Sequence, residues 1–428
     1  MVRAHFAVLT AISLACSSVD AEEYRYPYHD PYVATATTAI VNADRLLPRL
    51  RRQIVYVPGL PARNQLPFLE GRGELGVALY RQHHPAPLLF ILPGIGSNPY
   101  FGLATYLASL FYREGSHVVI LPSPMSWNFA LAASRSGAPG YAPEDARDLY
   151  TAMQRTLTVI RTRHDVKTTG INFLGVSLGA LEGAYVSVID AEQRSIGIEQ
   201  YLLVNPPLDL AYALRRIDEW DALQKRFGKK RSELVLAKAV TIVESFSNDR
   251  RDDPAVFDRL AKEFAAFTTE EIQFLIAQDM RLLLPELVYV TQVIHDHNSH
   301  GRAKSRARSR LEAAKDVTFM DYRERIALPA WRRQAGEPDT DLATFTKRGS
   351  LAPILNRLRT NSRVHIMHNA DDVLADIKSM RELKDVLGDQ VMLYPFGGHL
   401  GNLWYANNKE DALRVLRARL ERQTTAQE

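Results

Sequence analysis

The sequence has a single cysteine, Cys16, among its 428 residues. It contains no apolar run of the roughly 18 residues that a helix needs to cross a bilayer, so we expect no transmembrane segment. It also has little excess of one charge, with 53 Lys and Arg against 49 Asp and Glu and a formal net charge of +4. So small an excess does not indicate nucleic acid, and we predict no nucleic-acid partner. The remaining composition, 46% hydrophobic and 24% charged, excludes a disordered or collagen-like chain.

The start of the sequence has the features of an export signal. A positive charge at Arg3 precedes a short, mostly apolar stretch at residues 6–15, and small residues lead up to Ala21. We therefore predict a signal peptide over residues 1–21 that is cleaved after Ala21. The mature protein is expected in a bacterial periplasm or outside the cell.

The position of the cysteine matters for the chemistry. Cleavage after Ala21 removes Cys16, so the mature chain would have no disulfide, no thiolate nucleophile and no metal bound by cysteine. Export without disulfides favours a periplasmic protein with a large core. A lipoprotein acylated at Cys16 is the alternative, which we rank second because Ser13 stands where such signals usually have Leu.

Short apolar runs of strand length alternate with helix-length amphipathic stretches along much of the chain. The eight runs stand at residues 54–57, 75–80, 88–92, 118–121, 171–174, 201–204, 364–367 and 391–394. Such alternation predicts a mostly parallel sheet with helices on both faces. The predicted fold class is therefore α/β, with eight strands.

The alternation stops in the middle of the sequence. From residue 208 to about residue 355 the pattern is helical only, which predicts a large helical cap inserted into the α/β core. A basic run within it, at residues 302–310, alternates with small residues and is interpreted as a solvated loop. The predicted organisation is a signal peptide (1–21), a Tyr- and Pro-rich lead-in (22–52), the first part of the core (53–207), the cap (208–355) and the second part of the core (356–428).

A G-x-S-x-G motif centres on Ser177, in the run Gly175-Val176-Ser177-Leu178-Gly179. An apolar strand leads into it and a helix start rich in small residues follows, which is the setting of a nucleophile elbow. Glycines are needed there because the strand and helix backbones come too close for a Cβ atom. A Gly-rich turn that only packs, or that binds an anion, would leave the same pattern. We predict Ser177 as a nucleophile.

A candidate acid and a candidate base follow Ser177 in the chain order Ser, Asp, His that accompanies a nucleophile elbow. Asp372 follows the seventh apolar run, at the strand end where open α/β sheets bind ligands. His399 lies one helix and one strand further on, in a glycine-rich loop. The neighbouring Asp371, and Asp209 after the sixth run, remain alternative acids.

The third apolar run leads into Pro93-Gly94-Ile95-Gly96. The backbone N–H groups of Ile95 and Leu178 would together form an oxyanion hole, which stabilises the charge that a carbonyl oxygen gains in the transition state. A plain glycine turn is the alternative interpretation.

Together these motifs resemble an α/β-hydrolase, and within that superfamily they are most similar to bacterial YheT-like esterases. The motifs are Leu92-Pro93-Gly94, the G-x-S-x-G run, Asp371-Asp372, an N-P-P after the sixth strand, and Gly397-Gly398-His399-Leu400-Gly401. The resemblance spans roughly residues 53–207 and 360–422. It implies an α/β-hydrolase sheet of eight strands, with Ser177 as nucleophile, His399 as base, Asp372 as acid, and Ile95 and Leu178 as oxyanion donors.

We expect an exported serine hydrolase that cleaves small-molecule carboxylic esters, lipid-like ones included, through an acyl-enzyme. Acyl transfer, or cleavage of thioesters or amides by the same residues, is one alternative, and a catalytically idle binding protein is another. No cofactor is predicted, since no G-x-G-x-x-G follows the first strand. No metal is predicted, because His295, Asp296, His297 and His300 match no standard zinc spacing. The apolar stretch 281–290 either lines an acyl pocket or buries the cap on the core.

Overall fold

The protein is described by a computed structural model that covers residues 24–39, 50–61, 63, 73–100, 102–246, 254–295 and 303–417. The predicted signal peptide, with Cys16, lies outside these residues. Among the helices that are described, none combines the length and apolar character required to span a membrane.

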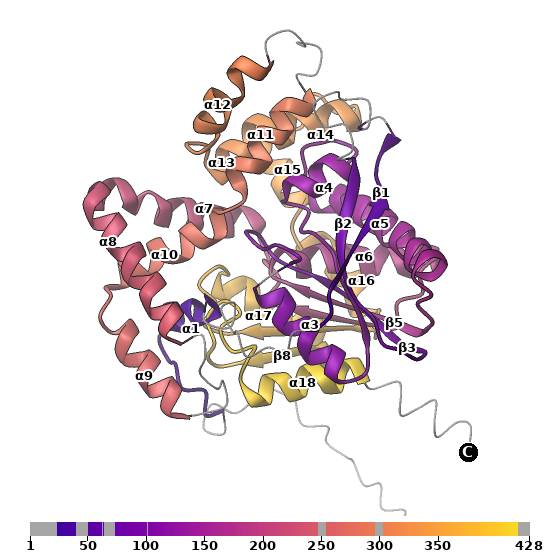
Figure 1. Ribbon diagram of the computed structural model, residues 1–428, viewed down its shortest axis with the longest axis horizontal. Coiled ribbons are helices and arrows are strands. Elements are labelled where there is room, and N and C mark those ends of the chain that lie inside the picture. Colours follow the sequence, from indigo (N-terminus) through magenta and orange to yellow (C-terminus); the bar gives the residue numbers. More distant parts are fainter. Residues whose placement is uncertain are drawn as a thin grey trace, which may run out of the picture.

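All eight apolar runs form strands of a single sheet (Figure 1). The strands are β1 (Gln53–Pro58), β2 (Glu74–Tyr80), β3 (Ala86–Leu92), β4 (His117–Ile120), β5 (Thr168–Val176), β6 (Gln200–Val204), β7 (Val364–Asn369) and β8 (Val391–Tyr394). Their order is β1-β2-β4-β3-β5-β6-β7-β8. β2 runs antiparallel to both of its neighbours, β1 and β4. In the remaining order β4-β3-β5-β6-β7-β8, each strand is parallel to the next. This is the sheet of the α/β-hydrolase fold, and the predicted fold class is confirmed.

Helices cover both faces of the sheet, as the continuous apolar runs of the central strands require. Every residue of β4 is buried, and so are six of the seven residues of β3. Figure 1 shows α3 and α18 on one side of the sheet and α5, α6 and α16 on the other. The core helices are α3 (Leu103–Arg113), α4 (Trp127–Ala132), α5 (Ala142–Arg163), α6 (Leu178–Gln193), α16 (Leu355–Arg359), α17 (Ile377–Leu387) and α18 (Ala406–Arg417).

Between β6 and β7 the described residues form helices and no strand. Besides α16, the α-helices there are α7 (Leu210–Asp221), α8 (Leu223–Ser245), α9 (Pro254–Phe264), α10 (Thr269–Arg281), α11 (Leu284–His295), α12 (Ala303–Ala314), α13 (Phe319–Tyr322), α14 (Leu328–Ala335) and α15 (Leu342–Arg348). A capping box between Thr268 and Glu271 starts α10. The nearly buried Arg281 joins the end of α10 to α7 through Asp218 and Asp221, both at 3.3 Å.

One local expectation for this region is wrong. The basic run 302–310 is not a loop, because residues 303–310 lie in helix α12. Arg, Lys and Ala are among the strongest helix formers, so alternating them favours a helix even though the pattern has no apolar face.

The Tyr- and Pro-rich lead-in is part of the hydrophobic core. Tyr24 and Tyr26 are buried, and the Tyr26 ring lies 5.9 Å from that of Trp404 and 5.5 Å from that of Tyr405. The hydroxyl of Tyr24 donates a hydrogen bond of 2.7 Å to Oδ1 of Asn408, so the buried hydroxyl has a partner. The segment then turns into α1 (Pro31–Ala36), which packs against α10.

Three acidic side chains are buried together where α5 meets α6. Asp145 accepts hydrogen bonds from the backbone N–H groups of Gly140 and Tyr141, at 2.6 and 2.9 Å. Glu182 on α6 is only 1% exposed, and one of its carboxyl oxygens has no hydrogen-bond partner among the described residues. Burial, together with the charges of Asp145 and Asp148, raises the pKa of Glu182 well above its usual value. Burial therefore favours the protonated, neutral form of Glu182 in the folded protein.

The pKa of Glu182 predicts how the stability of the fold depends on pH. Because the folded state holds this proton more tightly than the unfolded state, the free energy of unfolding falls as the pH rises above about 4.5. The substitution Glu182→Gln removes this term. It should raise the free energy of unfolding at pH 8 by ~1 kcal/mol or more, the scale on which single substitutions act. At pH 4 the variant and the wild type should be nearly equal.

Urea unfolding at a series of pH values measures this effect. The control is Glu192→Gln, which removes an exposed carboxyl from the same helix and should leave the pH dependence unchanged. Some pH dependence should remain in Glu182→Gln, since burial also raises the pKa of Asp145. Parallel stability curves for the wild type and Glu182→Gln would contradict the prediction.

Candidate active site

Ser177 stands at the sharp turn between β5 and α6. Its φ angle of 53° is in the left-handed region, and its N–H donates to the carbonyl oxygen of Val204 at 2.9 Å. The flanking glycines are required by close backbone contacts: a Cβ atom on Gly179 would lie 2.1 Å from the carbonyl oxygen of Leu92, and one on Gly175 2.2 Å from that of Gly179. The G-x-S-x-G spacing thus has a steric cause, and the turn holds the serine in a strained conformation.

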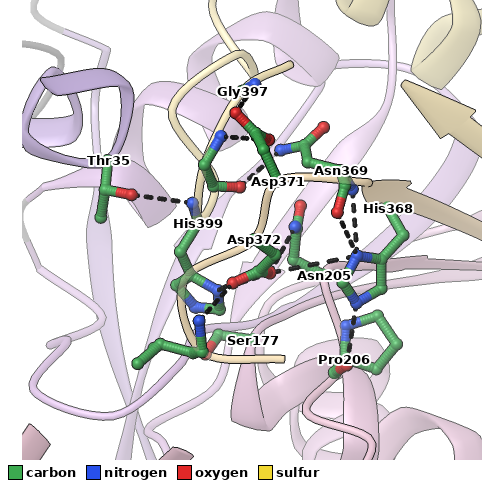
Figure 2. A network of polar contacts seen from close by, with 12 residues as sticks. Thr35, Ser177, Asn205, Pro206, His368, Asn369, Asp371, Asp372, Gly397 and His399 are labelled. Carbon is green, nitrogen blue, oxygen red and sulfur yellow. Dashed lines mark hydrogen bonds and ion pairs between the residues drawn. The ribbon is translucent and has the colours of Figure 1, made fainter. Parts of the chain in front are cut away.

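The structure brings Ser177, Asp372 and His399 together at the carboxyl ends of the strands (Figure 2). Nε2 of His399 lies 2.9 Å from Oγ of Ser177, and Nδ1 lies 2.9 Å and 3.1 Å from the two carboxyl oxygens of Asp372. A carboxylate can only accept, so the imidazole proton belongs on Nδ1 and Nε2 is free to accept the serine proton. His399 and Asp372 are 2% and 5% exposed, whereas Ser177 is half-buried.

The carboxyl group of Asp372 is surrounded by donors. Besides His399, it accepts hydrogen bonds from the side-chain amide of Asn205 at 2.7 Å and from the N–H of Leu374 at 2.8 Å. Burial acts to raise the pKa of Asp372, but the imidazole of His399, the nearby His368 and the Leu374 N–H lower it below its usual value. Asp372 therefore stays ionised. Sequence reasoning did not name Asn205 as a site residue, although it begins the N-P-P motif.

The two alternative acids take other positions. The carboxyl of Asp371 accepts from the backbone N–H groups of Gly397 and Gly398, at 3.2 and 2.9 Å, and burial raises its pKa to about 6. The carboxyl of Asp209 accepts from the N–H of Ala211 and begins α7. Asp371 thus holds the backbone of the histidine loop, and of the three candidate acids only Asp372 bonds the imidazole of His399.

The N-terminal helix α1 holds the histidine loop from the other side. The backbone N–H of His399 donates to Oγ1 of Thr35 at 2.8 Å (Figure 2). The glycines of the loop allow this approach, since a Cβ on Gly398 would lie 2.5 Å from Thr35 Oγ1 and one on Gly401 2.0 Å from the carbonyl oxygen of Ala34. Sequence reasoning missed Thr35. The glycines around His399 indicate that another backbone comes close, but they do not say which one.

The two residues predicted as oxyanion donors lie beside the serine. Ile95 and Leu178 line the same small space as Ser177 and His399. The preceding Gly94 touches the serine, because a Cβ on it would lie 2.8 Å from the Cβ of Ser177. The loop after β3 and the first residue of α6 therefore both border the space beside Ser177, and their role as oxyanion donors stays a prediction.

A cavity of about 290 Å³ opens beside Ser177 and His399. Its walls are mostly apolar and come from α1, α8, α9 and α10; they include Leu236, Val240, Ile242, Phe264, Phe267, Leu275, Ile276 and Met280. No residue of the apolar stretch 281–290 lines it. Most of that stretch belongs to α11, which packs against α4 with Leu287 and Val288 buried, so of the two interpretations burial is the one the structure supports.

Comparison with known proteins identifies no family for this chain. No protein-family model matches the chain, and no curated protein is similar to it in sequence. Similar solved structures include brefeldin A esterase, a bacterial homologue of human hormone-sensitive lipase, with 14% identity, a TM-score of 0.41, and coverage of 90% of this chain and 84% of that one. Carboxyl esterase 2 of the mycorrhizal fungus Tuber melanosporum has 14% identity and a TM-score of 0.41, with coverage of 90% and 96%. The α/β hydrolase GrgF of Penicillium sp. sh18 has 14% identity and a TM-score of 0.40, with coverage of 86% of this chain and 99% of that one. The likeness to YheT-like esterases stays a prediction.

The contact between Thr35 and His399 predicts a positioning role for the N-terminal helix. Thr35→Val removes the acceptor without changing the size of the side chain, and should slow labelling of Ser177 by a fluorophosphonate at least ~10-fold, because small displacements of a reacting group are costly. Thr35→Ser keeps the hydroxyl and should restore the rate.

The matched control is Thr38→Val, because Thr38 lies on the same segment but its hydroxyl bonds within that segment, to the carbonyl oxygen of Thr35. Its labelling rate should stay close to that of the wild type. If folded Thr35→Val is labelled as fast as the wild type, Thr35 does not position the imidazole.

Proposed function

We propose that the protein is a serine hydrolase that cleaves carboxylic esters, with Ser177 as nucleophile, His399 as base and Asp372 as acid. The observation that carries this proposal is the continuous chain of contacts from Asp372 through the imidazole to Oγ of Ser177, each 2.9 Å long. That separation is within the reach that proton transfer requires. The apolar cavity beside the serine supports a substrate with an apolar acyl or alcohol group.

In the first half of the reaction, Oγ of Ser177 attacks the ester carbonyl carbon while Nε2 of His399 takes the hydroxyl proton. Asp372, kept ionised by its donors, stabilises the imidazolium that forms. The N–H groups of Ile95 and Leu178 stabilise the negative oxygen of the tetrahedral intermediate. As that intermediate collapses, the imidazolium gives its proton to the leaving alcohol oxygen and the acyl group stays on Ser177.

In the second half, a water molecule gives one proton to His399 and its oxygen attacks the acyl carbon. The imidazolium then returns the proton to Oγ of Ser177, and a carboxylic acid leaves. Apart from the ester and the water molecule, neither half of the reaction uses a molecule from outside this chain. We further propose, from the sequence alone, that the protein is exported after cleavage at Ala21.

Substitutions at the two adjacent aspartates test the assignment most sharply. Asp372→Asn should lower kcat/KM for 4-nitrophenyl esters by about 10⁴-fold, because an amide no longer fixes the Nδ1–H tautomer of His399. Asp371→Asn is the matched control: its single amide oxygen can still accept from the N–H of Gly398 and only the longer bond from Gly397 is lost, so the loss in kcat/KM should stay below about tenfold. Ser177→Ala should abolish fluorophosphonate labelling.

Esters graded by acyl length, assayed with water alone and with added alcohol or amine acceptors, complete the experiment. Acyl transfer that outruns hydrolysis would make the protein a transferase with the same residues. Folded protein that neither turns over any ester nor is labelled would contradict the proposal and leave a catalytically idle binding protein.

A further inference from the structure

The cavity beside the catalytic residues has acidic side chains in its wall. Among the described residues that line it, Asp279 and Glu244 are acidic, and none is Lys or Arg. His399 is the one lining side chain that can become positive, and it must be neutral to act as a base. The rest of the lining is uncharged and mostly apolar, so these carboxyl groups set the electrostatic character of the space.

Asp279 faces this space from α10 and is one of its lining residues. The residue is exposed, but the protein atoms around its carboxyl reduce hydration and raise its pKa above the usual value. Within the described part of the chain, its carboxyl has no hydrogen-bond or ion-pair partner.

The position of Asp279 does not serve the fold. It stands in the last turn of α10, where the helix dipole disfavours a negative charge. Residues elsewhere on α10 do stabilise the helix, in particular the capping box at its start.

The backbone of Asp279 is fixed against the loop that follows β3. Gly96 in that loop has a φ angle of 74°, and a Cβ on it would lie 2.7 Å from the carbonyl oxygen of Asp279 and 2.9 Å from that of Met280. The same loop contains Ile95, which borders Ser177. The carboxyl is therefore attached to the part of the cap that touches the reactive centre.

We propose that Asp279 is a specificity-determining residue that pairs with a positively charged group on the substrate, so that the preferred ester carries an ammonium group on an otherwise apolar acyl or alcohol chain. This inference rests on the proposed function. An ammonium brings the hydrogen-bond donors that the carboxyl lacks, and a charge-assisted hydrogen bond in an apolar space is strong. A substrate with a carboxylate or phosphate would be repelled by both Asp279 and Glu244.

Three 4-nitrophenyl esters of similar length test the proposal. They are esters of 6-aminohexanoic acid, of heptanoic acid, and of adipic acid with its second carboxyl free, which end in an ammonium, a methyl and a carboxylate group. The wild type should prefer the ammonium ester by kcat/KM and use the carboxylate ester least. In Asp279→Asn the ratio of kcat/KM for the ammonium ester to that for the heptanoyl ester should fall at least ~10-fold.

The control variant is Glu270→Gln, which removes an exposed carboxyl from the same helix and should leave this ratio unchanged. A ratio that is the same in Asp279→Asn as in the wild type, or a wild type that prefers the heptanoyl ester, would overturn the proposal.

A binding measurement separates failure of this inference from failure of the proposed function. Calorimetry with Ser177→Ala compares heptylammonium with 1-heptanol, and needs no catalysis. Tighter binding of heptylammonium that is lost in the double variant with Asp279→Asn supports the role of Asp279 even if no ester is turned over. Ester hydrolysis with no effect of Asp279→Asn on either measurement would overturn the inference and leave the hydrolase intact.

Discussion

The position of one imidazole is the constraint on which the rest of the site depends. His399 can act as a base only if Nδ1 keeps its proton and Nε2 faces Ser177, and the 2.9 Å contact with Asp372 enforces both. The carboxyl of Asp372 can do this only while ionised, which requires its own donors, Asn205 and Leu374. Each contact in the site therefore depends on the next one. The sheet determines their positions, because Ser177, Asn205 and Asp372 follow the ends of β5, β6 and β7.

The N-terminal segment completes this arrangement from outside the sheet. Its tyrosines are buried against Trp404 and Tyr405, just beyond the histidine loop, and α1 lies on that loop. Thr35 contacts the backbone of His399 and also lines the cavity, as do residues of α8, α9 and α10. Core, N-terminal segment and cap consequently meet at one place, so a change in the packing of any of them reaches the reacting atoms.

How much the sequence predicts follows from the range of the interactions. Local patterns determine the strands and the elbow. The strands follow from the apolar runs, which their periodicity identifies. The elbow follows from the close backbone approach that excludes a Cβ from Gly175 and Gly179, which the G-x-S-x-G motif identifies. Thr35 lies 364 residues from its partner, and only the folded chain brings the two together. The lead-in was missed for the same reason: its tyrosines have no local period because they pack on distant rings. For the run 302–310 the reason is different. Its alternating charges suggest a solvated loop, whereas the intrinsic helix propensity of Arg, Lys and Ala favours the helix that forms.

Carboxyl groups in this protein differ in which groups surround them, and that difference separates structural from functional roles. Asp372 has an imidazole, an amide and a backbone N–H around it, which hold its pKa low despite burial. Burial and the charges of acidic neighbours raise the pKa of Glu182, which favours its protonated, neutral form. Asp279 is exposed, has no donor among the described residues, and alone of the three lines the cavity beside Ser177. A carboxyl group that has no partner in that part of the protein and lines this cavity is the basis for the proposed pairing with a positive charge on the substrate.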